Sequence, residues 1–190
     1  MKIDIVVTGM IQENCYLVSD DSGIAAVVDP GDNADKILNR IDSEGLKVEW
    51  ILLTHGHYDH VGAVADVRNA TGAKVAIHEA DRLAVRFEAD MLVDDGDTIA
   101  CGDLEFTAVT TPGHTPGCVC YICGDAIFTG DTLFRESIGR TDLAGGDFSQ
   151  MRKSLIKLRD VPYDDLKVYP GHMEPTTLEY ERENNPFIGI

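Results

Sequence analysis

The chain has 190 residues, 44% of them hydrophobic, and it carries 16 Lys and Arg against 33 Asp and Glu, a formal net charge of −17. These values predict a globular protein, organised as a single domain over residues 1–190, that buries a core without disulfide bonds. A surface this acidic repels phosphate backbones, so we expect no nucleic-acid partner. No apolar run approaches the length of a membrane span, so we expect no membrane association.

The cysteines and the N-terminal residues indicate a cellular compartment. Five cysteines, an odd number, do not indicate a disulfide framework. In one predicted strand Cys118 and Cys120 alternate with Val119 and Tyr121, which favours buried free thiols over metal ligands. Asp4 interrupts the first apolar run, which is too short for a signal peptide. We therefore expect a soluble cytoplasmic protein, while its oligomeric state is left open.

Runs of β-branched and apolar residues bounded by Gly, Asp or Asn predict strands in both halves of the chain, and apolar residues at helical spacing predict helices between them. Because hairpin-like strand runs occur in each half, two sheets flanked by helices are favoured over a doubly wound parallel sheet. The predicted strands are Ile3–Val7, Cys15–Ser19, Ile24–Val28, Val48–Leu53, Lys74–Ile77, Leu104–Thr110, Cys118–Ile122, Ala126–Thr129 and Leu166–Tyr169. The predicted helices are Asn33–Glu44, Val61–Thr71, Glu79–Glu88 and Phe148–Leu158.

Five of the six histidines stand at strand ends or in turns beside Gly, Pro or Asp, where the chain can turn sharply and approach an ion. His55 and His57 lie two residues apart, so in an extended segment their side chains share a face. Imidazole and carboxylate groups suit zinc, with iron and manganese as alternatives. One tetrahedral ion cannot use all of these groups, so two metal ions that share a carboxylate are predicted. The groups are His55, His57, Asp59, His60, His114, Asp131 and His172.

The segment Thr54–His60 resembles the signature of the metallo-β-lactamase superfamily. The likeness covers nearly the whole chain, because it includes Asn14-Cys15-Tyr16, Val28–Gly31 and the later metal motifs. The resemblance implies an α/β fold, a four-layer αββα sandwich with the metal ions at one edge of the sheets. It also implies the ligand sets, which are His55, His57 and His114 for the first ion, Asp59, His60 and His172 for the second, and Asp131 as the bridge.

Individual positions indicate a branch of the superfamily. An Asp at position 131 is similar to the glyoxalase II and phosphodiesterase branches, whereas several β-lactamases carry Cys or Ser there, so lactamase activity is not expected. His57 stands where the flavodiiron branch has Glu, and Ile138–Leu143 resembles the single-domain, glyoxalase II-like hydrolases. Only 18 residues follow His172, so we expect no helical domain of the kind that contributes to glutathione binding in two-domain glyoxalase II.

The predicted reaction is hydrolysis of a small-molecule thioester, such as lactoylglutathione. Two cations lower the pKa of a shared water to about 7, and the resulting hydroxide attacks the carbonyl carbon. The resemblance assigns Asp59 to one metal ion, and we expect its free oxygen to orient the nucleophile. A thiol with a pKa of about 8.5 leaves without a dedicated acid, and these motifs contain no obvious proton donor beyond the ligands.

Four further residues are expected to support the site. Metal-bound histidines usually donate their second N–H to an acceptor, and Asp29, Thr54 and Thr115 are candidates to orient the ligands in this way. A plain turn or helix-cap role remains the alternative for Asp29. The guanidinium of Arg140 matches a substrate carboxylate, and its alternative is an ion pair within the Asp142 loop.

Other activities are compatible with the same motifs. An iron-dependent persulfide dioxygenase resembles this fold and uses two His and one Asp, here His55, His114 and Asp131. A phosphodiesterase or nuclease is disfavoured by the acidic charge, and a lactonase is a further alternative within the superfamily. A binding module that uses metal without catalysis is disfavoured because the ligand set is complete. Metal analysis combined with oxygen uptake separates the hydrolase from the dioxygenase.

Overall fold

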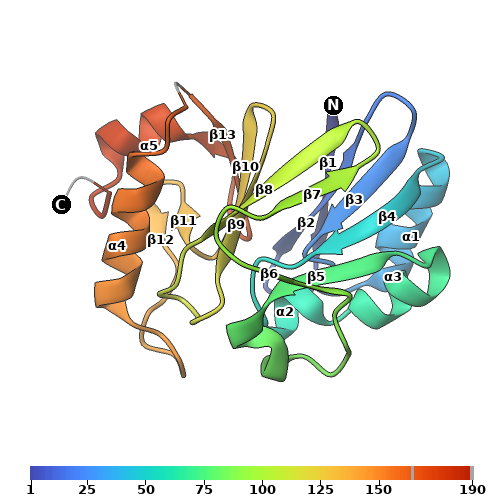
Figure 1. Ribbon diagram of the computed structural model, residues 1–190, viewed down its shortest axis with the longest axis horizontal. Helices are drawn as coiled ribbons and strands as arrows, with labels where there is room; N and C mark the ends of the chain where they lie inside the picture. Colours follow the sequence, from blue (N-terminus) through green and yellow to red (C-terminus); the bar gives the residue numbers. More distant parts are fainter. Residues whose placement is uncertain (164, 189–190) are drawn as a thin grey trace.

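The structure is a computed structural model that describes residues 1–163 and 165–188. Within them, two six-stranded sheets pack against each other and carry helices on their outer faces (Figure 1). This arrangement confirms the four-layer αββα sandwich predicted from the sequence. In the same residues, no helix is both long enough and apolar enough to span a bilayer.

The N-terminal half forms the first sheet, with its strands in sequence order from β1 to β6. The strands β1, β2 and β3 are antiparallel neighbours, whereas β3, β4, β5 and β6 run parallel. The helices α1 (Ala34–Ser43) and α3 (Val64–Thr71) cover the outer face through buried side chains such as Ile37 and Val67. The strands are β1 Lys2–Thr8, β2 Glu13–Ser19, β3 Ile24–Val28, β4 Lys47–Leu52, β5 Lys74–His78 and β6 Met91–Val93.

The second sheet has the order β14-β13-β10-β9-β8-β7, in which only β10 and β13 are parallel neighbours. The helix α4 (Phe148–Arg159) covers its outer face, and α5 (Leu178–Asn184) lies beside it (Figure 1). The strands are β7 Thr98–Cys101, β8 Leu104–Thr110, β9 Val119–Cys123, β10 Ala126–Gly130, β13 Lys167–Pro170 and β14 Thr176–Thr177, and a separate hairpin joins β11 Leu133–Phe134 to β12 Ser137–Ile138.

Strand alternation explains how the chain fills three apolar layers. In β9, Val119 and Tyr121 point between the sheets, while Cys120 points toward α4. All five cysteines are buried and unpaired, which confirms the buried free thiols predicted for Cys118 and Cys120. The predicted start of this strand was one residue early, because Cys118 precedes β9 and its Sγ lies 3.1 Å from Thr115 Oγ1.

Two predicted helices differ from the observed ones. The predicted helix Val61–Thr71 corresponds to α3, which begins three residues later, at Val64. Val61 is instead the last residue of a separate short helix, α2 (Tyr58–Val61), which begins directly after His57. The predicted helix Glu79–Glu88 is wrong beyond Ala84. Residues Glu79–Ala84 form a 3-10 helix, η1, and Val85, which follows it, has an extended backbone. Contacts of η1 with distant loops, described below, compete with a regular α-helix.

The topology brings distant segments to one edge of the sandwich. The parallel strands β3 and β4 end there and lead to Asp29 and to the segment Thr54–His60. The parallel strands β10 and β13 end at the same edge and lead to Asp131 and His172. The loop before β9 supplies His114. The carboxyl ends of parallel strands in α/β proteins are common places for ligand sites.

Candidate metal centre

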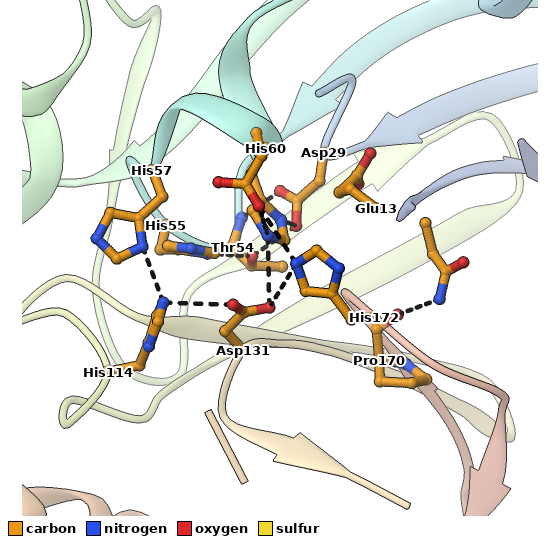
Figure 2. A network of polar contacts seen from close by, with 12 residues as sticks. Glu13, Asp29, Thr54, His55, His57, His60, His114, Asp131, Pro170 and His172 are labelled. Carbon is orange, nitrogen blue, oxygen red and sulfur yellow. Dashed lines mark hydrogen bonds and ion pairs between the residues drawn. The ribbon is translucent and has the colours of Figure 1, made fainter. Parts of the chain in front are cut away.

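All seven side chains that the sequence predicts as metal ligands meet at this edge, in two groups with Asp131 between them. Figure 2 labels all of them except Asp59. The first group consists of His55, His57 and His114, whose facing nitrogen atoms all lie within 4.8 Å of one another. His57 Nδ1 is 2.8 Å from His114 Nε2. Three imidazole nitrogens that converge in this way are a typical arrangement for zinc or iron.

The second group consists of Asp59, His60 and His172, and its potential ligand atoms satisfy the same distance limit of 4.8 Å. Asp59 Oδ2 lies 3.2 Å from His172 Nε2 and 3.5 Å from His60 Nε2. His172 comes from the end of β13, far from the other two in sequence. Its preceding Gly171 is required by space, since a Cβ there would lie 2.6 Å from both Asp131 Oδ1 and His60 Cε1.

Asp131 faces both groups. Its Oδ2 is 3.3 Å from His114 Nε2, and its Oδ1 is 3.4 Å from His60 Nε2 and 3.8 Å from His172 Nε2. The side chain is buried at the end of β10. One carboxylate with an oxygen toward each histidine group has the geometry of a bridge between two ions.

Several buried polar atoms in the cluster lack hydrogen-bond partners among the described residues, namely His55 Nε2, His60 Nε2 and Asp131 Oδ1. Leaving a buried polar atom unsatisfied costs about 1–3 kcal/mol, so such atoms are rare in native proteins. A divalent cation placed among these three atoms would accept their lone pairs. The residues present therefore fit a metal site.

The protonation of the cluster also suits cations. Burial and neighbouring imidazoles lower the pKa of His55 and His57, which keeps both rings neutral. Against the effect of burial, nearby carboxylates raise the pKa of His60 and His172. Burial alone would raise the pKa of Asp131, but the neighbouring histidines, His60 above all, lower it. A metal ion at these nitrogen atoms would compete with protons for them, so its affinity would depend on pH.

Asp29 and Thr54, two of the predicted supporting residues, contact two of the ligand rings (Figure 2). Asp29 Oδ2 accepts hydrogen bonds from Thr54 Oγ1 at 2.6 Å and from His60 Nδ1 at 3.0 Å. Because the Thr54 hydroxyl donates to Asp29, it accepts from His55 Nδ1 at 3.0 Å. Both rings thus turn their Nε2 atoms toward the centre, so the role of Asp29 goes beyond that of a plain turn residue.

The side chains of the other two predicted supporting residues, Thr115 and Arg140, contact aspartates outside the ligand set. Thr115 contacts no ligand ring, since its Oγ1 donates to Asp81 Oδ2 at 2.7 Å. The exposed guanidinium of Arg140 forms two hydrogen bonds of 2.9 Å to Asp142, which is the ion pair considered as its alternative. Its backbone carbonyl has an unforeseen contact, because it accepts a hydrogen bond from His114 Nδ1 at 2.7 Å.

Three residues near the site carry roles that the sequence did not reveal. Asn14 Nδ2 donates to the carbonyls of Pro170 at 3.0 Å and Met173 at 2.8 Å, and so fixes the turn that carries His172. Glu13 is buried with one oxygen bonded to Thr8 Oγ1 and the other without a partner in the described residues. The third, Asp81, is described below. In the sequence, the one local signal of these roles is the polar pair Glu13-Asn14 at the start of the otherwise apolar strand β2.

A cavity of about 470 Å³ opens onto the cluster. This volume suits a small molecule rather than a polymer. Apart from the metal-site side chains, the cavity wall is mostly apolar, and Arg140 is its one arginine or lysine among the described residues. The wall is formed by Ile11, Tyr58, Phe134, Ile138, Arg140 and Leu143.

Comparisons with known proteins agree with this geometry. A family model described as the metallo-beta-lactamase superfamily matches residues 8–172. The chain is 34% identical to the hydroxyacylglutathione hydrolase GloC of Haemophilus influenzae, over 99% of this chain and 98% of that protein. The crystal structure of BLEG-1 B3 metallo-beta-lactamase is 33% identical, with a TM-score of 0.93 over 98% of this chain and 99% of that chain. TTHA1623 in a di-iron-bound form is 37% identical, with a TM-score of 0.86 over 97% and 99%.

Proposed function

The chain belongs to the metallo-beta-lactamase superfamily, and on this premise we propose that it is a hydrolase with two metal ions that cleaves acyl thioesters. The observation that carries the proposal is the pair of ligand groups with Asp131 between them, where buried nitrogen and oxygen atoms lack partners among the described residues. Similarity to a hydroxyacylglutathione hydrolase supports the thioester as substrate.

Two divalent ions held by these residues would supply hydroxide near neutral pH and a Lewis acid for the carbonyl oxygen. Zinc is the expected metal, with iron as the main alternative, because imidazole and carboxylate ligands suit both. The proposed ligands are His55, His57 and His114 for one ion, Asp59, His60 and His172 for the other, and Asp131 for both.

The chain's own residues orient the reactants. Asp59 lines the cavity and faces His60 and His172 through Oδ2, so its carboxylate is suited to orient the attacking nucleophile. Beyond the metal-site residues, the cavity wall offers no carboxyl or imidazole group among the described residues that could protonate a leaving group. A thiolate leaves without protonation, whereas an amide nitrogen does not, which favours a thioester over an amide.

The proposed substrate lies along the apolar wall, with its acyl carbonyl at the metal-ligand cluster. Arg140 is the proposed partner of a substrate carboxylate, and it must then exchange its contact with Asp142 for the substrate. The two partners are both exposed, so their ion pair is weak and readily exchanged. Because the cavity wall offers one guanidinium and otherwise apolar side chains, we expect loose discrimination between thiol groups.

The test is a panel of thioesters that differ separately in acyl and thiol parts, assayed with the zinc-loaded protein. We expect hydrolysis of several members, a high KM for lactoylglutathione, and loss of activity with a chelator. The same protein is assayed on a β-lactam and on a phosphodiester. Inactivity toward every thioester, together with turnover of another class, would overturn the proposed substrate and leave the metal site intact.

An iron-dependent persulfide dioxygenase is the second candidate, and the observation that favours it is a set of two histidines and one carboxylate that suits a single iron. His55 and His114 belong to the same ligand group, and Asp131 Oδ2 lies 3.3 Å from His114 Nε2. Iron-loaded and zinc-loaded protein are compared on the thioester panel and on glutathione persulfide, with oxygen uptake recorded. Oxygen uptake that depends on persulfide and iron, without thioester cleavage, would replace the hydrolase by the dioxygenase.

A further inference from the structure

Asp81 is a buried carboxylate outside the metal cluster, with 3% of its surface exposed. We propose that Asp81 is a positioning residue that holds the two loops of the first histidine group, His55 with His57 and His114, at the spacing a metal ion needs. The inference rests on the metal centre of the proposed function and is independent of the thioester substrate.

The contacts of Asp81 join segments that are far apart in sequence. Its Oδ2 accepts hydrogen bonds from Gly56 N at 2.9 Å and Thr115 Oγ1 at 2.7 Å, and its Oδ1 accepts one from Gly117 N at 2.9 Å. Gly56 stands between His55 and His57, and Thr115 directly follows His114. One carboxylate therefore ties both ligand-bearing loops to η1.

Steric constraints show how closely the loops approach this carboxylate. A Cβ on Gly117 would lie 2.6 Å from both Cγ and Oδ1 of Asp81, closer than any real side chain sits. The neighbouring thiol of Cys118 contacts Thr115 Oγ1 at 3.1 Å, so the hydroxyl is held from two sides. The His114 loop thus has little room to move relative to Asp81.

Chemistry requires a carboxylate at this position. All three partners are N–H or O–H donors, and hydrogen bonds to an ionised acceptor are about twice as strong as neutral ones. An asparagine presents one NH2 group in place of an oxygen, so it turns a donor toward Gly117 N or toward Gly56 N and Thr115. Asp81→Asn therefore preserves shape while removing at least one of the three contacts.

The structure provides a control in Asp20, which is also buried, with 6% of its surface exposed, and directly follows β2 at the end opposite Glu13. Asp20 accepts hydrogen bonds from the backbone N–H groups of Ser22 at 2.8 Å, Ile24 at 3.0 Å and Asp103 at 2.9 Å. Asp20→Asn thus damages the same kind of contact and lowers stability without touching either ligand loop.

The experiment measures zinc affinity by competition with a chromophoric chelator, cobalt(II) absorption spectra, and unfolding midpoints for wild type, Asp81→Asn and Asp20→Asn. We expect Asp81→Asn to weaken one of two zinc sites by up to about the 10- to 100-fold that losing a direct hydrogen-bond partner of a ligand costs. The site that still holds metal in Asp81→Asn should be the same as in His57→Ala and different from that in His172→Ala. Asp20→Asn should retain both affinities and the wild-type cobalt spectrum, although its midpoint falls.

Thr115→Val removes one contact of Asp81 without removing a charge. We expect a several-fold loss of affinity at the same site, and this variant decides the question if Asp81→Asn does not fold. Wild-type affinity in Thr115→Val, or equal metal loss in Asp81→Asn and Asp20→Asn, overturns the positioning role. If wild type binds two zinc ions but cleaves no thioester, the proposed function fails while this inference stands. If wild type cleaves thioesters and Asp81→Asn binds zinc normally, the proposed function stands and the positioning role of Asp81 fails.

Discussion

Asp131 is the carboxylate that faces both ligand groups, at 3.3 Å from His114 Nε2 and 3.4 Å from His60 Nε2. A residue shared by two ions differs from a terminal ligand in what its removal does. We predict that Asp131→Ala weakens both metal ions by more than about 100-fold, beyond the usual cost of losing an outer partner, and abolishes turnover. His172→Ala should empty chiefly the second site. Metal analysis of both variants checks this, and two retained ions in Asp131→Ala would disprove the bridge.

Glu13 offers a prediction about pH at the same scale. Burial raises the pKa of this carboxyl well above its ordinary value of 4.5, so the folded chain keeps its proton to higher pH than the unfolded chain. The free energy of unfolding therefore falls as pH rises from about 4.5 through the raised pKa. Glutamine carries no ionisable proton. We predict that Glu13→Gln gains stability relative to wild type as pH rises through this window.

The measurement is chemical unfolding of metal-free wild type and Glu13→Gln between pH 4.5 and 8. The exposed Glu179 provides the matched control, since Glu179→Gln changes the same group without burial. A stability difference between Glu13→Gln and wild type that stays constant with pH would contradict the prediction. The difference removes the titration of the histidine cluster except for the electrostatic interaction between Glu13 and His60.

Single residues also show what sequence reasoning can and cannot find. The segment Thr54–His60 concentrates four of the seven predicted ligands in one motif, and turns with Gly reveal the other three. Asp81 gives no such signal, because Glu79-Ala80-Asp81-Arg82 reads as the polar face of a helix. Its three partners lie 25 to 36 residues away, so its role exists only in the folded chain.

Secondary structure elements were predictable where they are long and strongly buried. Strands such as β2 and β9 bury every residue, and their composition alone identifies them. The strands β6, β7 and β14 are two to four residues long and were missed, because pairing with a neighbour stabilises them more than their own sequence does. The helix α5 was missed because four of its seven residues are charged.

The helix α5 supports the cavity through one buried glutamate. Glu181 accepts hydrogen bonds from Glu136 N at 2.8 Å, Thr176 Oγ1 at 2.7 Å and Asn185 Nδ2 at 2.8 Å. Asn185 in turn donates to the carbonyls of Phe134 and Ser137 at 3.2 and 3.0 Å. These contacts hold the hairpin β11–β12, which supplies part of the apolar cavity wall.

We therefore predict that Glu181→Ala raises KM several-fold, changes kcat little and leaves metal content intact, since Glu181 contacts no predicted ligand. Leaving the Glu136 N–H without its partner should lower the free energy of unfolding by about 1–3 kcal/mol. Steady-state kinetics, metal analysis and chemical unfolding check the three parts. Glu179→Ala, on the exposed face of the same helix, should match wild type in each. Loss of metal in Glu181→Ala would show that α5 supports the ligands as well.

At the scale of the whole molecule, the net charge of −17 sets the field that a substrate meets on approach. Two divalent ions would offset only four of these charges, and the guanidinium at the cavity already pairs with Asp142. Anionic thioesters, including glutathione conjugates, should therefore be repelled at long range. A neutral thioester with the same acyl group should not.

Ionic strength distinguishes the anionic from the neutral thioester, because the electrostatic screening length falls from about 30 Å at 0.01 M to about 10 Å at 0.1 M. We predict that kcat/KM for lactoylglutathione rises several-fold over this range, while the value for lactoyl-N-acetylcysteamine stays nearly constant. The ratio of the two values cancels any effect of salt on the metal site or on stability. A ratio that falls with salt would mean that the local positive field of the metal ions and Arg140 dominates the approach. The acidic surface would then have no influence on which thiol the enzyme accepts.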